Sequence, residues 1–272
     1  VLGLELTRAL WVHAAQGNDR NLGERGERLP AQGSQHLAVG MAAGREHRGK
    51  EHGVGAVGAA QFAQGMDRDE PEQSGSARQI GAVNTVVVNA DGSLRGTNTD
   101  AFGYIHSLRE AQPDWRADQG AAVVLGAGGA ARAVVWALAD AGVKDIRLLN
   151  RSLDKAQAMA ADFGAPVQAL EWSQRHAALA DAGLLVNTTT QGMQGQPALD
   201  IDLSALPMHA LVSDIVYTPL QTDLLLRAAA RGHPVVNGLG MLLHQARPGF
   251  QAWFGVMPEV TPALWQKVLA TF

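Results

Sequence analysis

The chain has 272 residues, a formal net charge of −4 and no cysteine. Its length allows two domains with buried cores, its slight negative charge without a basic stripe argues against a nucleic-acid partner, and no apolar run approaches the ~20 residues of a membrane span. The lack of cysteine excludes disulfides, thiolate metal sites and a cysteine nucleophile, and it is compatible with a reducing, cytoplasmic setting.

The N-terminal quarter of the chain lacks the pattern of a packed domain. Residues 13–77 are rich in Gly, Ala, Gln, Arg, Glu and His, and their few large apolar side chains follow neither the period of a strand nor that of a helix. This composition is typical of a poorly packed or disordered segment. Two other hypotheses stay open: a frameshifted reading of a GC-rich gene, restored before Arg78, or a genuine but diverged N-terminal domain. Val1–Leu4 does not have the basic start of a signal peptide, so we expect none.

From Ile80 onward, apolar runs alternate with helical patterns, as in an α/β protein. Gly81–Asn89 predicts a strand, and a turn then leads into a short strand near Leu94. Thr99 or Asp100 is expected to cap a helix that runs to about Glu110. Later in the chain we expect strands at Val167–Leu170, Leu184–Asn187, Leu211–Asp214 and Pro234–Val236, and helices at Asp154–Phe163, Leu220–Arg231, Gly240–Phe254 and Pro262–Leu269.

A glycine-rich turn in the middle of the chain carries the clearest functional signal. It joins a predicted buried strand, Ala121–Leu125, to a predicted helix, Ala130–Ala141, and a second strand follows at Ile146–Leu149. This layout is typical of a dinucleotide site, in which glycines allow a tight turn and a close approach to the pyrophosphate at the helix N-terminus. A purely structural turn is the alternative. Gly126 would allow the tight turn, Gly128 would let the backbone approach the pyrophosphate, and Ala131 is small enough for the helix to pack on the strand.

The end of the second strand indicates which dinucleotide would bind. Sites for NAD usually place an acid there, to accept hydrogen bonds from the ribose 2′-hydroxyl. This chain has Asn150 and Arg151 instead, with Lys155 shortly after. Because basic side chains attract a 2′-phosphate and an acid would repel it, we expect NADP(H) as the cofactor. A solvated basic start of the next helix is the alternative.

Short motifs in the same order and spacing resemble one family, the NADP-dependent shikimate dehydrogenases. Besides the glycine-rich turn and the Asn-Arg-Ser-x-x-Lys run, they are Gly-Ala-Val-Asn-Thr at 81–85, Gly-Thr-Asn-Thr-Asp at 96–100, Asn-Thr-Thr-Thr-Gln-Gly-Met at 187–193, Asp-Ile-Val-Tyr-Thr-Pro-Leu at 214–220, and Asn-Gly-Leu-Gly-Met-Leu-Leu-His-Gln at 237–245. The resemblance covers about residues 78–272.

The resemblance implies a fold and an activity. The fold would be a Rossmann-like doubly wound parallel sheet, residues 101–238, with a second α/β substrate domain from residues 1–100 plus 239–272. The active site would lie in the cleft between them, at the carboxyl ends of the strands. The reaction would be the reversible NADPH-dependent reduction of 3-dehydroshikimate to shikimate. We expect no metal ion, and either a monomer or a homodimer.

The resemblance also implies roles for individual residues. Asp100 would be the acid of a Lys–Asp catalytic pair and would bind substrate together with Asn84, Tyr217 and Gln245. Ile215 and Gly238 would lie beside the nicotinamide. The other cofactor contacts implied by the resemblance are Gly126, Ala127, Gly128, Gly129, Ala130, Asn150, Arg151 and Lys155. Each has a plainer alternative when taken singly: a helix cap for Asp100, a turn for Asn84, a core aromatic for Tyr217 and a surface position for Gln245.

The chain departs from the family pattern before residue 78. The family's Ser-x-Ser pair and its Asn-Val-Thr-x-Pro-x-Lys run are absent, and the expected position of the catalytic Lys, near residue 63, is Ala63. Lys50 is the only lysine before Asn84, and its placement makes it a poor substitute. Two further interpretations therefore stay open: a quinate/shikimate dehydrogenase relative, and an NADP-binding remnant with impaired catalysis.

Overall fold

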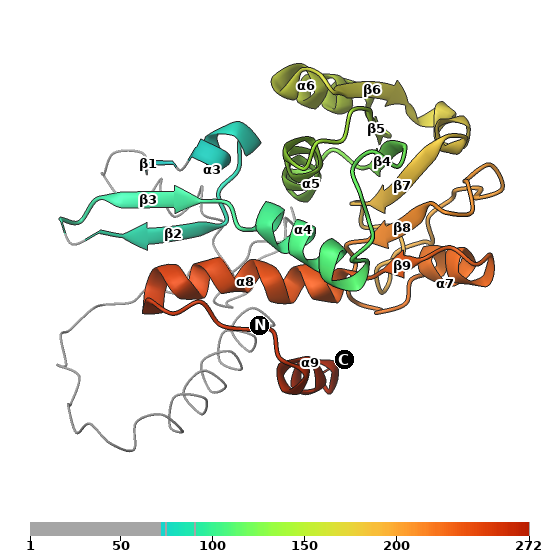
Figure 1. Cartoon of the computed structure of the whole chain (residues 1–272). Coiled ribbons are helices and arrows are strands. Elements are labelled where there is room, and N and C mark those ends of the chain that lie inside the picture. The colour runs from blue at the N-terminus through green and yellow to red at the C-terminus, as the bar shows by residue number, and fades with distance from the viewer. Residues whose placement is uncertain (1–71, 74, 90, 272) are drawn as a thin grey trace, which may run out of the picture. The chain divides into compact units, whose positions relative to one another are not determined.

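A computed structural model describes residues 72–73, 75–89 and 91–271 of the chain. These residues fall into two compact units (Figure 1). Unit 1 contains residues 72–73, 83–89, 91–97 and 246–271, and unit 2 contains residues 75–82 and 98–245. Most of the unusual segment 13–77, including Lys50 and Ala63, lies outside the described residues.

Unit 2 is built on a six-stranded parallel sheet with the strand order β6-β5-β4-β7-β8-β9. The chain moves outward from β4 to β6 in one direction and then from β7 to β9 in the other, which makes the sheet doubly wound, with its switch point between β4 and β7. The strands are β4 (Ala121–Leu125), β5 (Ile146–Asn150), β6 (Val167–Glu171), β7 (Ala182–Asn187), β8 (Leu211–Asp214) and β9 (Val235–Val236). The parallel sheet expected from the sequence is confirmed.

Helices cover both faces of this sheet, because successive residues of a strand point to opposite faces. Ala122 and Val124 of β4 pack in one buried cluster, together with side chains of five helices: α3 (Gly75–Ile80), α4 (Asp100–Ala111), α5 (Gly129–Asp140), α6 (Leu153–Phe163) and the start of α8 (Gly238–Phe254). Val123 and Leu125 pack in the other cluster, together with α7 (Asp223–Ala230) and the 3-10 turn Ala177–Leu179. Figure 1 shows α5 and α7 on these two sides of the sheet.

Unit 1 contains a small sheet and the C-terminal helices. β2 (Thr85–Val88) and β3 (Leu94–Thr97) form an antiparallel hairpin, and β1 (Glu72–Gln73) pairs with β3 in parallel. The later residues of α8 pack on the hairpin, since the Trp253 indole Nε1–H donates to the Val86 carbonyl at 3.2 Å. Helix α9 (Pro262–Leu269) follows, with its first turn capped by the Thr261 hydroxyl. A complete second α/β domain for the substrate stays a prediction.

Two expected elements are shorter than the sequence suggested. The strand expected from Gly81 begins only at Thr85, because α3 (Gly75–Ile80) ends just before it and Gly81 then takes a left-handed conformation with φ of 70°. The helix expected from Leu220 begins only at Asp223. The Thr222 hydroxyl caps it by accepting from the Leu225 amide at 3.4 Å.

The cap of α4 differs from both residues proposed from the sequence. Thr99 occupies the N-cap position, but its side chain does not make the capping bond, and Asp100 is already the first helical residue. The Asn98 side-chain oxygen accepts from the Asp100 amide at 3.0 Å and the Ala101 amide at 3.4 Å. Its amide nitrogen also donates to the Ala82 carbonyl at 3.2 Å. Asn98 therefore fixes the helix start, and Asp100 is the first residue of α4 rather than its cap.

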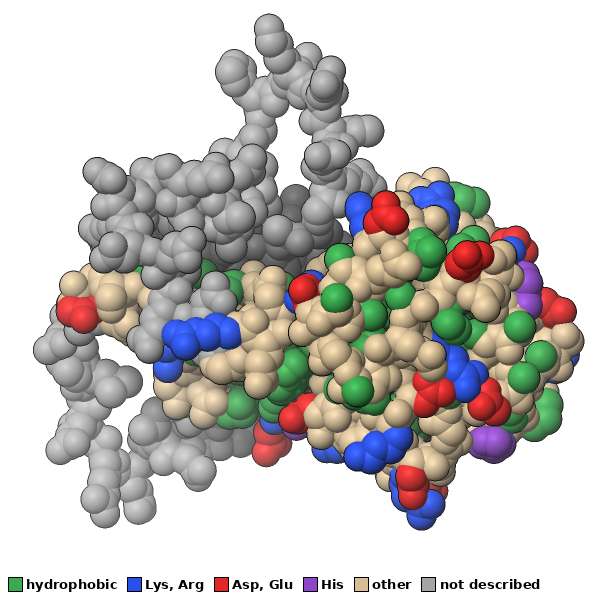
Figure 2. Space-filling model, turned by 90° about the horizontal axis from the view of Figure 1, so that it is seen from above, with side chains coloured by type: hydrophobic (Ala, Val, Ile, Leu, Met, Phe, Trp, Pro, Cys, Tyr) green, Lys and Arg blue, Asp and Glu red, His purple; other side chains and the backbone are tan. Residues whose placement is uncertain are grey.

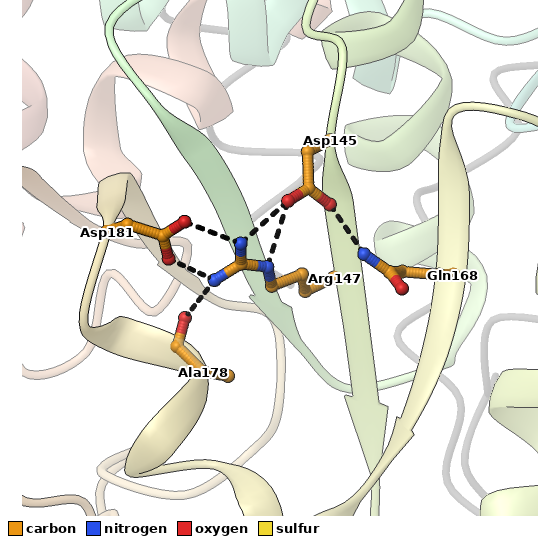
Figure 3. A network of polar contacts seen from close by, with 5 residues as sticks. All are labelled: Asp145, Arg147, Gln168, Ala178 and Asp181. Atoms are coloured by element: carbon orange, nitrogen blue, oxygen red, sulfur yellow. Dashed lines mark hydrogen bonds and ion pairs between the residues drawn. The ribbon is translucent and has the colours of Figure 1, made fainter.

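A polar network ties together the amino ends of the strands, at the edge opposite the glycine-rich turn (Figure 3). The Arg147 guanidinium of β5 donates to the carboxylates of Asp145 and Asp181, and to the Ala178 carbonyl at 2.9 Å. Gln168 of β6 donates to Asp145 at 2.8 Å. The hydrogen bond from Arg147 holds the pKa of Asp181 below its usual range. The network is structural, because it joins β5, β6 and the segment before β7.

Candidate functional site

The glycine-rich turn follows β4, and its first residue, Gly126, has a conformation that excludes a side chain. Gly126 has φ of 109°, and its amide donates to the Leu149 carbonyl at 2.7 Å. A Cβ placed on Gly126 would lie 2.6 Å from the Thr188 hydroxyl oxygen. That hydroxyl is held in turn by donating to the Leu125 carbonyl at 2.7 Å. The turn after β4 is therefore packed against the loop after β7.

The next two glycines face open space. Gly128 is the N-cap residue of α5 and Gly129 its first helical residue, and both are exposed. A Cβ on either one would meet no protein atom within 4 Å. The first amides of a helix have no partner within the helix, and they carry the positive end of its dipole. Ala131 one turn on is fully buried against the sheet, so the helix N-terminus is fixed while its front is open to an anion.

The residues expected to select the cofactor lie at the end of β5, the strand next to β4, and at the start of α6. Asn150 ends β5 and donates from its side chain to the Ser152 carbonyl at 2.9 Å. Arg151 and Lys155 follow, and both are exposed. No acid occupies positions 150–152. Together with the open helix N-terminus, this donor set fits a dinucleotide that carries a 2′-phosphate.

A buried polar cluster lies on the other side of β4, and the sequence analysis assigned it no role. Asp214 at the end of β8 is 1% exposed and Asn187 at the end of β7 is fully buried. Asp214 accepts from the Asn187 side chain at 3.0 Å, from the Val216 amide at 3.0 Å and from the Thr222 hydroxyl at 2.7 Å. A charged residue that ends an apolar run was the signal for it. Burial raises the pKa of the Asp214 carboxyl.

Ile215 and Gly238 are brought together next to this cluster. The Ile215 amide donates to the Asn187 carbonyl at 3.1 Å, and the Gly238 amide donates to the Val216 carbonyl at 3.1 Å. A Cβ on Gly238 would lie 2.1 Å from the Ile215 carbonyl oxygen. The start of α8 can approach the loop after β8 this closely only because residue 238 is glycine.

Asp100 and Gln245 are brought together by a close crossing of α4 and α8. A Cβ on Gly103 would lie 2.6 Å from the Gln245 Cβ, and one on Gly240 would lie 2.3 Å from the Ser107 hydroxyl oxygen. The two helices are therefore antiparallel, and Gln245 packs beside the first turn of α4, one turn from Asp100. Gln245 is 7% exposed and Asp100 is half-buried, so the surface position considered for Gln245 is wrong.

The other two residues expected to bind substrate lie in different parts of the chain. Tyr217 is half-buried in the loop after β8 of unit 2, so it is not a fully buried core aromatic. Asn84 belongs to unit 1, where its backbone amide donates to the Thr97 carbonyl at 3.1 Å and its side-chain oxygen accepts from the Thr85 hydroxyl. Asp100, Tyr217 and Gln245 thus belong to unit 2, while Asn84 lies directly before β2 in unit 1.

Among the described residues, no group of three or more His, Asp or Glu side chains could hold a metal ion. No helix of the described residues has the length and apolarity to cross a membrane. On the face seen in Figure 2, acidic and basic side chains of the described residues are intermixed.

Tyr104, on α4 one turn beyond Asp100, is buried, and burial raises its pKa well above the usual range.

The doubly wound sheet and the open glycine-rich helix N-terminus at its switch point define a dinucleotide-binding α/β protein. Comparison with known proteins identifies the group. The family model for shikimate / quinate 5-dehydrogenase matches residues 109–194. The chain is 60% identical over 194 residues to a shikimate dehydrogenase (NADP(+)) of Paramagnetospirillum magneticum, which covers 71% of this chain and 70% of the relative. The chain belongs to the shikimate dehydrogenase family.

Other relatives agree with this assignment. A shikimate dehydrogenase (NADP(+)) of Rhodospirillum rubrum is 56% identical, over 71% of this chain and 70% of its own. The structure of a Thermus thermophilus shikimate 5-dehydrogenase in complex with NADP(H) and shikimate has a TM-score of 0.62 at 36% identity, over 73% of this chain and 71% of that one. A quinate dehydrogenase of Corynebacterium glutamicum in complex with NAD has a TM-score of 0.68 at 32% identity, over 74% and 72%. Residues 1–74 are not part of the family match.

Proposed function

We propose that this protein is an NADP-dependent oxidoreductase that interconverts shikimate and 3-dehydroshikimate. The observation that carries the proposal is the combination, in one chain of this family, of an open helix N-terminus after β4 with Arg151 and Lys155 after β5. When bound, the nicotinamide supplies or accepts the hydride at its C4. The chain's own residues then have to bind the cofactor and the substrate, and to transfer the proton of the reacting hydroxyl.

The cofactor half of the proposed site has a direct physical basis. The amides at the start of α5 would bind the pyrophosphate, where the open fronts of Gly128 and Gly129 allow a close approach. Arg151 and Lys155 would bind the 2′-phosphate, and Asn150 would contact the ribose. Gly126, Ala127 and Ala130 shape the turn, with Ala127 packed against the buried cluster beneath it. Ile215 and Gly238 would face the nicotinamide.

In the substrate half, Asp100 would hold the reacting hydroxyl and polarise it. The first turn of a helix favours an ionised carboxylate, and the Asn98 cap fixes that turn. Gln245, beside the same turn, would bind ring hydroxyls, together with Tyr217 and with Asn84 of unit 1. This assignment corresponds to a substrate domain from residues 1–100 plus 239–272 and a cofactor domain from 101–238.

Two observations favour alternative activities. The family model and a solved relative include quinate dehydrogenases, so quinate is a second substrate to test, although the Arg151 and Lys155 pair disfavours an NAD-preferring enzyme. Ala63 stands where the family's catalytic Lys is expected, which favours a protein that binds NADP(H) with impaired turnover. A monomeric or homodimeric state and a cytoplasmic location stay predictions.

The test combines cofactor titration with an assay of turnover. We expect the wild-type protein to bind NADP+ more tightly than NAD+, and Arg151→Ala to weaken NADP+ by about 10–100-fold while changing NAD+ little, because a charge-assisted pair to phosphate is lost. The matched control is Arg116→Ala, which removes an exposed arginine paired with Asp118. Equal affinities for the two dinucleotides would refute the proposed cofactor.

Turnover is measured by reduction of NADP+ with shikimate or with quinate. Reduction with shikimate supports the proposed reaction, and faster reduction with quinate supports the quinate dehydrogenase alternative. Tight binding of NADP+ without turnover of either substrate supports the impaired protein that Ala63 suggests.

A further inference from the structure

The order of the strands determines which end of a bound dinucleotide lies where. The pyrophosphate site follows β4, and the proposed 2′-phosphate site follows β5, on one side of β4. Ligands of open α/β sheets lie outside the carboxyl ends of the strands, across the switch point. The nicotinamide end must therefore extend in the opposite direction, over the ends of β7 and β8. This orientation rests on the proposed function.

The two loops at those strand ends are connected through one carboxylate. One oxygen of Asp214 accepts from the Asn187 side chain and from the Val216 amide, and the other accepts from the Thr222 hydroxyl. Asn187 extends the network into the loop after β7, where its side-chain oxygen accepts from the amide and the hydroxyl of Thr189. All partners of Asp214 are donors without a formal charge, so the carboxylate is paired but not neutralised.

The geometry also limits how Asp214 acts. Its side chain is 1% exposed, so it does not reach a ligand at the surface of the sheet. Asp214 bonds to the Asn187 side chain and to the amide of Val216, the residue after Ile215. The Ile215 amide donates to the Asn187 carbonyl, and the Ile215 carbonyl packs against Gly238. Any change at Asp214 is therefore transmitted to the Ile215 backbone and to Thr189.

We propose that Asp214 is a positioning residue for the nicotinamide half of the cofactor site, acting by holding the loops after β7 and β8 in one arrangement. An alternative role is purely structural, in which the network stabilises the junction of β7, β8 and α7 without influence on the ligand. The two roles differ in one respect. A positioning residue affects the nicotinamide end of the cofactor selectively, whereas a structural one affects all ligands or none.

The experiment compares two ligands on the same variants. NADP+ is titrated beside 2′-phospho-ADP-ribose, which has the phosphates and the adenosine but no nicotinamide. Thr222→Val removes the hydroxyl donor to Asp214 at nearly constant volume, and Thr222→Ser restores it. We expect Thr222→Val to weaken NADP+ by about tenfold, as loss of a supporting hydrogen bond commonly does, and to leave 2′-phospho-ADP-ribose within about twofold. Thr222→Ser should return to wild-type affinity.

The chain offers a matched control for loss of a helix cap. Thr222 also caps α7, so its substitution loses a cap as well as the bond to Asp214. Thr261 caps α9 in the same way, with its hydroxyl accepting from the Leu264 amide at 3.2 Å, and both helices have 8 residues. Thr261→Val should leave both affinities unchanged. Equal weakening of the two ligands by Thr222→Val, or an unchanged NADP+ affinity, overturns the proposal.

Hydrogen exchange in the ligand-free protein provides an independent measurement. The Val216 amide bonds directly to Asp214 and the Thr189 amide bonds through Asn187, so both should exchange faster in Thr222→Val and not in Thr261→Val. Unchanged exchange at both amides overturns the proposal. Failure of the wild-type protein to bind NADP+ refutes the proposed function instead, and the exchange rates still decide whether Asp214 orders the two loops.

Discussion

Replacement of Gly129 by Ala should separate the stability of the fold from the affinity for the cofactor. A Cβ at Gly129 would meet no protein atom within 4 Å, and the residue is the first of α5. Alanine is a better helix former than glycine, so the free energy of unfolding should stay constant or rise by up to about 1 kcal/mol. The same methyl group would stand where the pyrophosphate must approach. Loss of one charge-assisted hydrogen bond, about 1.5–3 kcal/mol, corresponds to roughly 10–100-fold weaker NADP+ binding.

The assay is urea unfolding without ligand, followed by calorimetric titration with NADP+. Gly75→Ala is the matched control, because Gly75 is also the first residue of a helix and its Cβ would also meet no atom within 4 Å. It should change neither quantity beyond the small gain in helix propensity. If Gly129→Ala binds NADP+ within about twofold of the wild type, the phosphates do not lie at the start of α5, and the reasoning from the open turn is refuted.

Two other substitutions test the packing around the sheet. Gly238→Ala should lower the free energy of unfolding by about 3 kcal/mol, because its Cβ would lie 2.1 Å from the Ile215 carbonyl oxygen; a loss below about 1 kcal/mol in urea unfolding would contradict that contact. Arg147→Met should cost about 1–2 kcal/mol at neutral pH, since the guanidinium is 16% exposed but Asp181 is 69% exposed and screened. The lowered pKa of Asp181 gives a sign to the pH dependence: its contribution is full above its ordinary pKa of 3.8 and is lost as pH falls through the folded value. The difference in stability between the wild type and Arg147→Met should therefore shrink as the pH falls below about 4, and a constant difference down to acid pH would exclude this assignment.

Local patterns were enough to predict most elements of unit 2 and the last helix of unit 1. β4, β8 and α9 have the bounds expected from their apolar runs, and α5 differs by one residue at each end. These elements are specified by side chains near them in sequence: continuous apolar runs for buried parallel strands, and the glycine turn before α5. The residues after β4 and β5 that are expected to bind the cofactor could be named from the sequence for the same reason, because each lies close in sequence to the strand that positions it.

The features that the sequence did not reveal depend on contacts between distant residues. Asn98 caps α4 with its side-chain oxygen while its side-chain amide nitrogen donates to the Ala82 carbonyl, a partner 16 positions away. Asp214 becomes the centre of a network only when β7 and β8 pair, which brings Asn187 next to it across 27 positions. Burial of Gln245 depends likewise on the glycine-mediated crossing of α4 and α8. A linear pattern shows that such residues are polar, but it does not show which partner will satisfy them.

The exposed position of Arg151 and Lys155 has an evolutionary consequence. Neither side chain belongs to the buried clusters on the two faces of the sheet, so substitutions there leave the packing of the fold unaffected. The requirement for a 2′-phosphate can thus be acquired or lost without a compensating change in the core. Under the roles proposed for Arg151 and Lys155, a switch between the two dinucleotides would require changes at only a few surface positions.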